Sequence, residues 1–548
     1  MSRVLNAMNK LNPTARTENG AVSHATTGFL KGSACLDYFS KVGTYVKRPQ
    51  SVVDLDMVKI FSDDPELAIK IVFGTRLITR KPNGLPQALD SEPGVVELAP
   101  EYENQTGFGR KDEFYKAVLW MLRNENTRLY KNLHLIPLFG CWKDFLSEPL
   151  LSNIPVTWVY KLCKDNLDSQ LLRKYLPQIR SKGNVRTPRD GMRSSWAKGF
   201  AKYLGISEQD YRKLKSQGAA HVWQRQMGRG EWDKIHFNGI PGRAMKKHVT
   251  QTGRDKKTVF ERHDQIERLG EWLLKQKMVK FTGYPYELTK EAMNGPSLIQ
   301  KLMLDKQFET IIDPMRGHKL GNVLPVLDTS GSMGCEVVQG VTAMDICMSM
   351  GVAFSMMNTG WFRDTVCMFD NTSRIQKLAG GMCDRVQMIP RNAMGGTNFQ
   401  SVIEELIRVR KKNPEIPVEE YPDTLLVVSD MQFNPAGKNV KTNYEYAMKQ
   451  LNSVGLRDMR FIWWFVSGRG NDFPVTMDQK GCYIIGGFDP VNIKALMGLS
   501  QPAVAGMPDA VPSVGLVEHK TVATEKKQET PMDGMLNFLS QPIFKLVK

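Results

Sequence analysis

The sequence predicts a two-part chain, in which a series of α-helices precedes a doubly wound α/β domain. Over most of residues 1–322 the apolar residues recur every three or four positions, which is the spacing of amphipathic helices. After Gly321, apolar runs of four to six residues alternate with helical segments, a pattern typical of a parallel sheet with crossover helices. A length of 548 residues is also more than one domain usually holds. We therefore expect a helical domain in residues 1–322, an α/β domain in residues 323–500, and a linker with a C-terminal helix in residues 501–548.

The helical domain is predicted from residue 51 onward, where regular apolar spacing begins. Asp64 and Pro65 form a helix start within residues 51–79. Residues 80–106 are expected to form a loop or insertion, and residues 217–260 mainly loops with at most one short helix. Successive helices with short connectors indicate a helical solenoid. The other predicted helices cover residues 112–123, 126–138, 142–151, 155–165, 168–178, 194–204, 207–216 and 261–278.

The α/β domain is predicted from short apolar runs that alternate with helical segments. Such an alternation gives a sheet with helices on both faces. The expected strands are Val323–Leu327, Thr365–Phe369, Leu425–Val428, Phe461–Val466 and Cys482–Ile485. The expected helices lie near residues 339–357, 398–411, 443–453 and 490–498.

The net charge of +17 is concentrated in the helical domain. Residues 1–322 hold 52 Lys and Arg against 34 Asp and Glu, whereas residues 323–548 hold 22 against 23. Residues 151–250 alone hold 20 basic and 7 acidic residues. This asymmetry indicates a polyanionic partner, most often nucleic acid, although a solvated basic surface is the alternative.

Fourteen cations of this segment are candidate RNA contacts, because basic groups near aromatic rings suit phosphate neutralisation and base stacking. The nearby rings are those of Trp196, Trp223 and Trp232, whose alternative place is the core. The candidate cations are Arg180, Lys182, Arg186, Arg189, Arg193, Lys198, Lys202, Arg212, Lys213, Lys215, Arg225, Arg229, Lys246 and Lys247.

The sequence shows no sign of export or of a membrane span. The chain does not open with the basic, apolar and small-residue succession of a signal peptide, and no apolar run approaches the roughly 20 residues of a membrane helix. The eight cysteines include no Cys-x-x-Cys pair, so neither a zinc ribbon nor a disulfide framework is indicated. We expect a cytoplasmic protein without a membrane partner.

A divalent-cation site is indicated where the first strand ends. Asp328, Ser330 and Ser332 stand at alternate positions directly after the apolar run. Mg²⁺ prefers such oxygen ligands, with a carboxylate for charge and hydroxyls to complete the shell. The alternative is a turn in which a serine caps the next helix. Thr397 before one helix and Asp430 after another strand favour the metal, because loops at the carboxyl ends of strands meet at one edge of such a sheet.

The motifs DTSGS (328–332), GGT (395–397) and SD (429–430) resemble those of the von Willebrand factor A domain with its metal-ion-dependent adhesion site. The resemblance spans roughly residues 323–500. It implies that Asp328, Ser330, Ser332, Thr397 and Asp430 hold Mg²⁺ or another divalent cation, directly or through water. It also implies that one coordination position faces solvent and can take a carboxylate of a protein partner.

The helical domain resembles the TROVE module, which together with an A domain makes the Ro autoantigen type of RNA-binding protein. The similar segments are GFGR (107–110) with the helix that follows, and FGCWKDFL (139–146). TENGA (17–21) and RSSWAK (193–198) are similar to a divergent branch found in plants, fungi and viruses. The resemblance implies a ring of HEAT-like helical repeats with structured small RNA outside and ends of misfolded RNA in the hole.

These observations favour a monomeric, non-enzymatic RNA-binding protein, a ribonucleoprotein component with a Mg²⁺-dependent docking site. A protein-interaction scaffold that binds a partner's acidic residue through the metal is the alternative. A hydrolase is disfavoured, because Ser330 and Ser332 lie in no Gly-x-Ser-x-Gly frame and no Walker loop or positioned base is identifiable.

Overall fold

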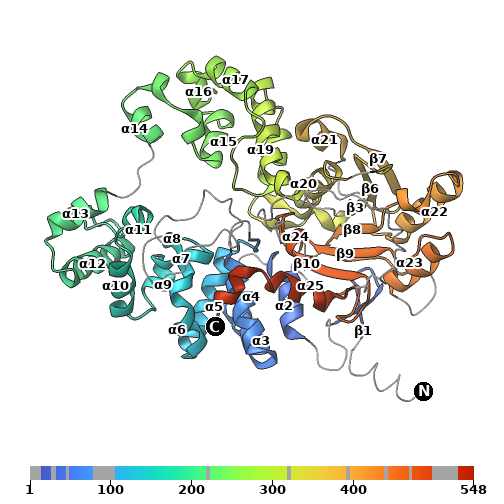
Figure 1. Ribbon diagram of the computed structural model, residues 1–548, viewed down its shortest axis with the longest axis horizontal. Coiled ribbons are helices and arrows are strands. Elements are labelled where there is room, and N and C mark those ends of the chain that lie inside the picture. Colours follow the sequence, from blue (N-terminus) through green and yellow to red (C-terminus); the bar gives the residue numbers. More distant parts are fainter. Residues whose placement is uncertain are drawn as a thin grey trace, which may run out of the picture.

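A computed structural model describes most of the chain (Figure 1). The described residues are 14–25, 33–44, 48–77, 105–217, 222–316, 322–358, 360–390, 395–436, 442–467, 472–496 and 529–548. The expected loop at 80–106 and the expected linker after residue 500 lie mostly outside these ranges. No helix among the described residues combines the length and apolar character that crossing a membrane requires.

The N-terminal part is helical, as predicted. Its helices follow an arc from α2 through α13 and back through α15 to α19 (Figure 1). Both ends of the arc contact the α/β part, since α2 packs on the sheet and α18 and α19 pack on its helices. The helices are α2 (Ala34–Val42), α3 (Gln50–Asp63), α4 (Pro65–Arg76), α5 (Lys111–Arg123), α6 (Thr127–Asn132), α7 (Ile136–Phe139), α8 (Trp142–Phe145), α9 (Glu148–Leu151), α10 (Val156–Asp165), α11 (Gln170–Tyr175), α12 (Pro188–Tyr203), α13 (Glu208–Ser216), α14 (Val222–Gly228), α15 (Gly242–Thr250), α16 (Val259–Arg262), α17 (Ile266–Leu274), α18 (Pro285–Ala292) and α19 (Leu298–Arg316).

The prediction of at most one short helix in residues 217–260 is wrong. This segment contains α14 and α15, and α16 begins at its end. The apolar residues of α15 are few, but Met245 and Val249 stand four apart and are both buried. Packing against α16 and α19 therefore stabilises this helix, although its sequence, rich in cations and begun by a glycine, shows little apolar periodicity.

The C-terminal part contains a mixed sheet of six strands in the order β10-β9-β8-β3-β6-β7. The five predicted strands are present and parallel to one another. The sixth, β7, is antiparallel to β6 and was not predicted, because its sequence SRIQK is polar and lies at an edge. The strands are β3 (Val323–Asp328), β6 (Thr365–Phe369), β7 (Ser373–Lys377), β8 (Thr424–Ser429), β9 (Arg460–Phe465) and β10 (Cys482–Gly486).

Alternate residues of the central strands pack on opposite faces of this sheet. Leu327 and Val428 belong to a core that is continuous with the helical part and includes α20 (Ala343–Ser355). Val326 and Val427 belong to a second core under α22 (Gln400–Lys412) and α23 (Asn443–Asn452). The remaining helices are α21 (Met382–Met388) and α24 (Asn492–Leu496). Two-sided burial explains why the strands read as continuous apolar runs.

The C-terminal segment returns to the helical part. Helix α25 (Pro531–Leu539) packs against α2, α4, α24 and β10. After it, the buried Gln541 side chain accepts a hydrogen bond of 2.6 Å from the backbone N–H of Thr106. The backbone N–H of Lys548 donates to Asn132 at 2.9 Å. The end of the chain therefore ties the sheet to the first helices of the arc.

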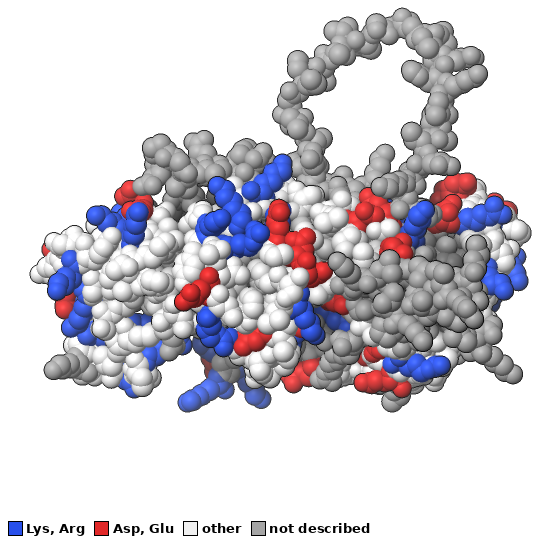
Figure 2. All heavy atoms as spheres, turned by 90° about the horizontal axis from the view of Figure 1, so that it is seen from below, with Lys and Arg blue, Asp and Glu red and all other residues white. Residues whose placement is uncertain are grey.

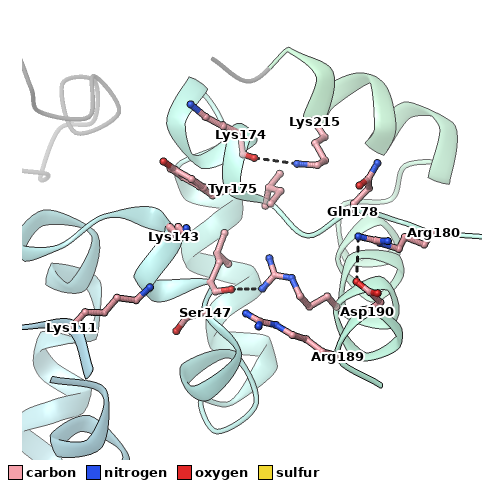
Figure 3. Close-up of a pocket in the computed structure, with 13 residues that line it drawn as sticks. Lys111, Lys143, Ser147, Lys174, Tyr175, Gln178, Arg180, Arg189, Asp190 and Lys215 are labelled. Carbon is pink, nitrogen blue, oxygen red and sulfur yellow. Dashed lines mark hydrogen bonds and ion pairs between the residues drawn. The ribbon is translucent and has the colours of Figure 1, made fainter. Parts of the chain in front are cut away.

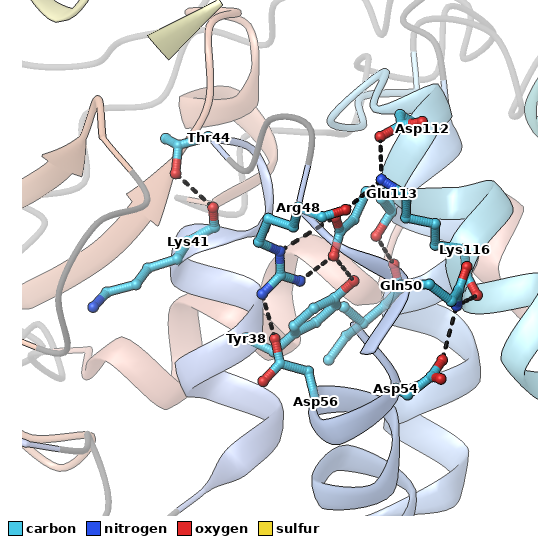
Figure 4. A network of polar contacts seen from close by, with 12 residues as sticks. Tyr38, Lys41, Thr44, Arg48, Gln50, Asp54, Asp56, Asp112, Glu113 and Lys116 are labelled. Carbon is cyan, nitrogen blue, oxygen red and sulfur yellow. Dashed lines mark hydrogen bonds and ion pairs between the residues drawn. The ribbon is translucent and has the colours of Figure 1, made fainter. Parts of the chain in front are cut away.

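A polar network joins α2, α3 and α5 near the sheet (Figure 4). The Arg48 guanidinium pairs with Asp56 at 2.6 Å and also pairs with Glu113, which is nearly fully buried. Tyr38 donates to the same Glu113 carboxylate at 3.2 Å. Since Glu113 lies in the first turn of α5, this network fixes the end of the helix from which Lys111 projects.

Candidate functional site

The five predicted metal ligands lie on three loops at one edge of the sheet, of which two follow strands and the third lies between α21 and α22. Asp328 ends β3, and Asp430 follows β8, which pairs with β3 in parallel. The hydroxyl oxygens of Ser330 and Ser332 are 3.2 Å apart. The loop before α22 is held nearby, because Gly331 N–H donates to the carbonyl of Gly395 at 3.2 Å. Thr397 follows on that loop and is buried.

The two carboxylates of this edge are buried and influence each other. The Asp328 side chain accepts hydrogen bonds from the Ser330 backbone N–H at 2.9 Å and from the Ser429 hydroxyl. Burial, and secondly the negative charge of Asp430, raise the pKa of Asp328 to about 7. Burial likewise raises the pKa of Asp430. Among the ion pairs between described residues, none involves either carboxylate.

This donor set fits a hard divalent cation. No three or more His, Cys, Asp and Glu side chains group together within the described ranges, so any ion here would rely on two carboxylates and three hydroxyls. Two carboxylates match the charge of Mg²⁺, and hydroxyl or water oxygens complete its octahedral shell. A cation between Asp328 and Asp430 would also remove the repulsion that now opposes their joint ionisation.

The N-terminal segment lies on this site, which the sequence did not predict. Strands β1 (Thr14–Arg16) and β2 (Val22–His24) form a hairpin whose turn contacts the loop after β8. Its Asn19 side chain donates to the carbonyl of Gln432 at 2.6 Å and is 3.4 Å from the Thr397 hydroxyl. The resemblance of TENGA (17–21) to a divergent branch says nothing about where this turn docks.

A second candidate site is a basic cavity of about 340 Å³ in the helical part (Figure 3). Its charged lining is seven Lys and Arg side chains against a single Asp. Residues from α5, α8, α11, α12 and α13 meet there, and Figure 3 shows Lys111 of α5 and Arg189 of α12 on opposite sides. The charged lining residues are Lys111, Lys143, Lys174, Arg180, Arg189, Asp190, Arg193 and Lys215.

The fold holds several of these cations close together. The Arg193 guanidinium donates to the carbonyl of Leu146 at 2.7 Å, and the Lys215 ammonium donates to the carbonyl of Lys174 at 3.1 Å. Arg180 pairs with Asp190 at 3.2 Å. Burial, and secondly the charge of Arg193, lower the pKa of Lys215. An anion that enters this partly desolvated cavity would reduce the repulsion between the positively charged side chains.

Of the fourteen predicted RNA contacts, the structure brings four into this cavity: Arg180, Arg189, Arg193 and Lys215. Others pair with acids, as Lys198 and Arg212 do with Glu208. Lys213 pairs with Asp210 and Lys246 with Glu291. Exposed cations that do not line the cavity are Arg186, Lys202, Arg225, Arg229 and Lys247, and Lys182 lies in a short 3₁₀ turn, Lys182–Asn184.

The surface does not present one continuous basic stripe on the face drawn in Figure 2, where groups of Lys and Arg alternate with acidic and neutral areas. The expected stacking role of the tryptophans is also wrong in two cases. Trp196 and Trp223 are buried, with 7% and 6% of their surface exposed. Trp232 stacks on His263 at 3.8 Å between ring centroids. These rings serve packing, which was the alternative.

Sequence reasoning missed Lys111 and Lys143, which line the cavity from α5 and α8. Both lie before the most basic segment of the chain, residues 151–250. The half-buried Tyr175 ring beside the cations was missed as well. Periodicity reports which face of a helix is buried but not which helices meet, so no signal in the sequence could have joined these residues to Arg193.

The protein therefore consists of an arc of helices joined to an α/β sheet, with a candidate metal site at the edge where strands β3 and β8 end. Residues 322–538 match the family model described as Domain of unknown function (DUF7788). The chain is also similar to Uncharacterized protein L728 of Acanthamoeba polyphaga mimivirus, at 22% identity over 540 residues, which cover 88% of this chain and 85% of the viral one. The family match includes α25, in agreement with the packing of that helix on β10. Neither description states a function, so the functional argument comes from the geometry.

Proposed function

We propose that this protein is a non-enzymatic RNA-binding protein of the Ro type, in which the arc of HEAT-like helices binds RNA and the A-type α/β domain completes the ring. The basic cavity carries the proposal, because seven Lys and Arg side chains surround about 340 Å³ with one acid among them. A hollow of this size accommodates a phosphate group together with its nucleoside. Structured or misfolded small RNA is the partner class.

The cavity suits an RNA chain better than a free inorganic ion. Lys111 and Lys143 stand across the cavity from Arg189, so successive phosphates could be neutralised along one path (Figure 3). The Tyr175 ring lies in the same lining and offers an aromatic surface for a base. Single-stranded RNA is recognised by this combination of cations and stacking rings.

The strength of RNA binding should depend steeply on salt. If about four phosphates are neutralised, a plot of log affinity against log salt for single-stranded RNA should have a slope of about −3. Fluorescence anisotropy of the full chain with a labelled RNA hairpin that carries a single-stranded tail measures this slope. Affinity that stays constant between about 50 and 200 mM salt, or no binding at the lower value, would contradict the proposal.

A protein-interaction scaffold remains the second candidate function, favoured by the two buried carboxylates at the sheet edge without a basic partner among the described ion pairs. In this case Mg²⁺ between Asp328 and Asp430 would bind an acidic residue of a partner. Asp430→Ala should then abolish capture of that partner and leave RNA affinity unchanged. Loss of RNA binding in a normally folded Asp430→Ala protein would show that the two sites are not independent.

A further inference from the structure

We propose that the chain supplies its own carboxylate to the candidate metal site, and that Glu18 in the turn of the N-terminal hairpin is this ligand. The cation would then act as an internal latch that fastens the N-terminal segment to the α/β part. The inference rests on the proposed metal site but not on RNA binding.

The turn is built onto the loop that carries Asp430. The buried Thr17 hydroxyl donates to the carbonyl of Phe433 at 2.6 Å. The backbone N–H of Glu18 donates to the Gln432 side chain at 2.7 Å, and Gln432 N–H donates to Asp430 at 3.2 Å. A single residue therefore bridges Glu18 to a predicted metal ligand.

The rest of the hairpin also has specific partners. Ala21 is 1% exposed and belongs to the core beneath α22 and α23. His24 pairs with Phe473 as an isolated bridge, and the Ser23 hydroxyl donates to Asp472 at 3.2 Å. These contacts place the backbone of the turn without help from the Glu18 side chain. That side chain is exposed and free to be used for another purpose.

A carboxylate at this position could take a coordination position that the donor set otherwise leaves to water. Asp328 and Asp430 supply two carboxylates, and Asn19 of the turn already reaches the Thr397 hydroxyl at 3.4 Å. Glu18 is repelled by these two acids unless a cation lies between them, and the three carboxylates form no close cluster among the described residues. Binding of the ion and approach of Glu18 are therefore expected to be coupled.

If binding of Mg²⁺ and approach of Glu18 are coupled, Mg²⁺ should protect the N-terminal segment from proteolysis, which the RNA-binding proposal does not predict. Mg²⁺ should slow tryptic cleavage after the exposed Arg16 of β1 by about tenfold in the full chain, because cleavage needs the hairpin to detach. In Glu18→Gln this protection should disappear, and the Kd for Mg²⁺ from the rise in Tm should weaken by about tenfold. For each protein, the cleavage rate in Mg²⁺ is divided by the rate in EDTA. Any effect of residue 18 on how well trypsin recognises Arg16 then cancels.

Two further variants make the result decisive. Glu404→Gln, at an exposed acid on α22 that is not one of the candidate ligands, makes the same change of charge and should behave as wild type. Asp430→Asn should abolish the effect of Mg²⁺ on cleavage, and adding Glu18→Gln to it should change nothing more. Equal Mg²⁺ affinity and equal protection in wild type and Glu18→Gln would overturn the role of Glu18. No response of the wild type to Mg²⁺ would overturn the metal site and this inference together, while leaving the RNA measurements as they stand.

Discussion

Reversing the charge of both Lys143 and Arg189 is expected to weaken RNA binding by about ten- to hundredfold. Hydrogen bonds to charged groups contribute about 1.5–3 kcal/mol each, and exposed contacts lie at or below the lower end of this range. Both side chains are exposed and line the cavity. Glu at these positions therefore makes the electrostatic potential of the cavity less positive without burying a charge. The double variant Lys143→Glu, Arg189→Glu thus tests the cavity rather than the fold.

The salt dependence of the same variant separates lost contacts from a general loss of positive charge. Each removed phosphate contact to a single strand should flatten the salt slope by about 0.7, so the double variant should lose about 1.4. Lys449→Glu on α23 is the matched control, since this lysine is exposed but far from the helical cavity in the chain and the fold. If Lys449→Glu weakened binding as much as a single cavity variant, RNA would be responding to net charge and the cavity would not be the site.

The sheet was predictable because buried strands leave a strong local signal. Runs such as Leu425–Val428 have no polar position, since both faces of the strand are covered, and the observed β8 extends them by one residue at each end. β7 gives no such signal, because an edge strand need bury only part of its side chains. The proximity of Asp328 and Asp430 was also predictable, because loops that follow neighbouring parallel strands must meet.

What could not be predicted are contacts between segments far apart in the sequence. Glu18 and Gln432 are separated by more than four hundred positions, and neither lies in a periodic segment. Lys111 begins α5, and Arg48 and Tyr38 hold the first turn of this helix through Glu113, a network that no spacing rule describes. Long-range docking of turns and helix ends depends on tertiary packing, which local propensity does not encode.

Asp328 should make the stability of the metal-free protein depend on pH. Its pKa is raised to about 7 in the folded chain, against about 3.9 in an unfolded one. Between these values the folded state binds more protons, so the free energy of unfolding falls as pH rises, by about 4 kcal/mol in total for this group. The stabilisation is complete below about pH 4 and is lost through pH 7. Urea unfolding in EDTA across this range measures it.

Magnesium should offset most of this fall, because the ion binds the ionised carboxylates and protons compete with it. At a hundred times its Kd, Mg²⁺ adds about 2.7 kcal/mol of stability at neutral pH, and the gain should vanish below about pH 4. Asp328→Asn should remove the contribution of Asp328 to the fall in EDTA and sharply reduce the gain in Mg²⁺, while Asp430, whose pKa burial also raises, still contributes to the fall. The buried Asp489, whose pKa burial raises to about 6, contributes equally to both proteins and cancels in their difference. A gain from Mg²⁺ that survives in the double variant Asp328→Asn, Asp430→Asn would place the ion elsewhere, since the sheet edge itself then keeps no carboxylate to hold it.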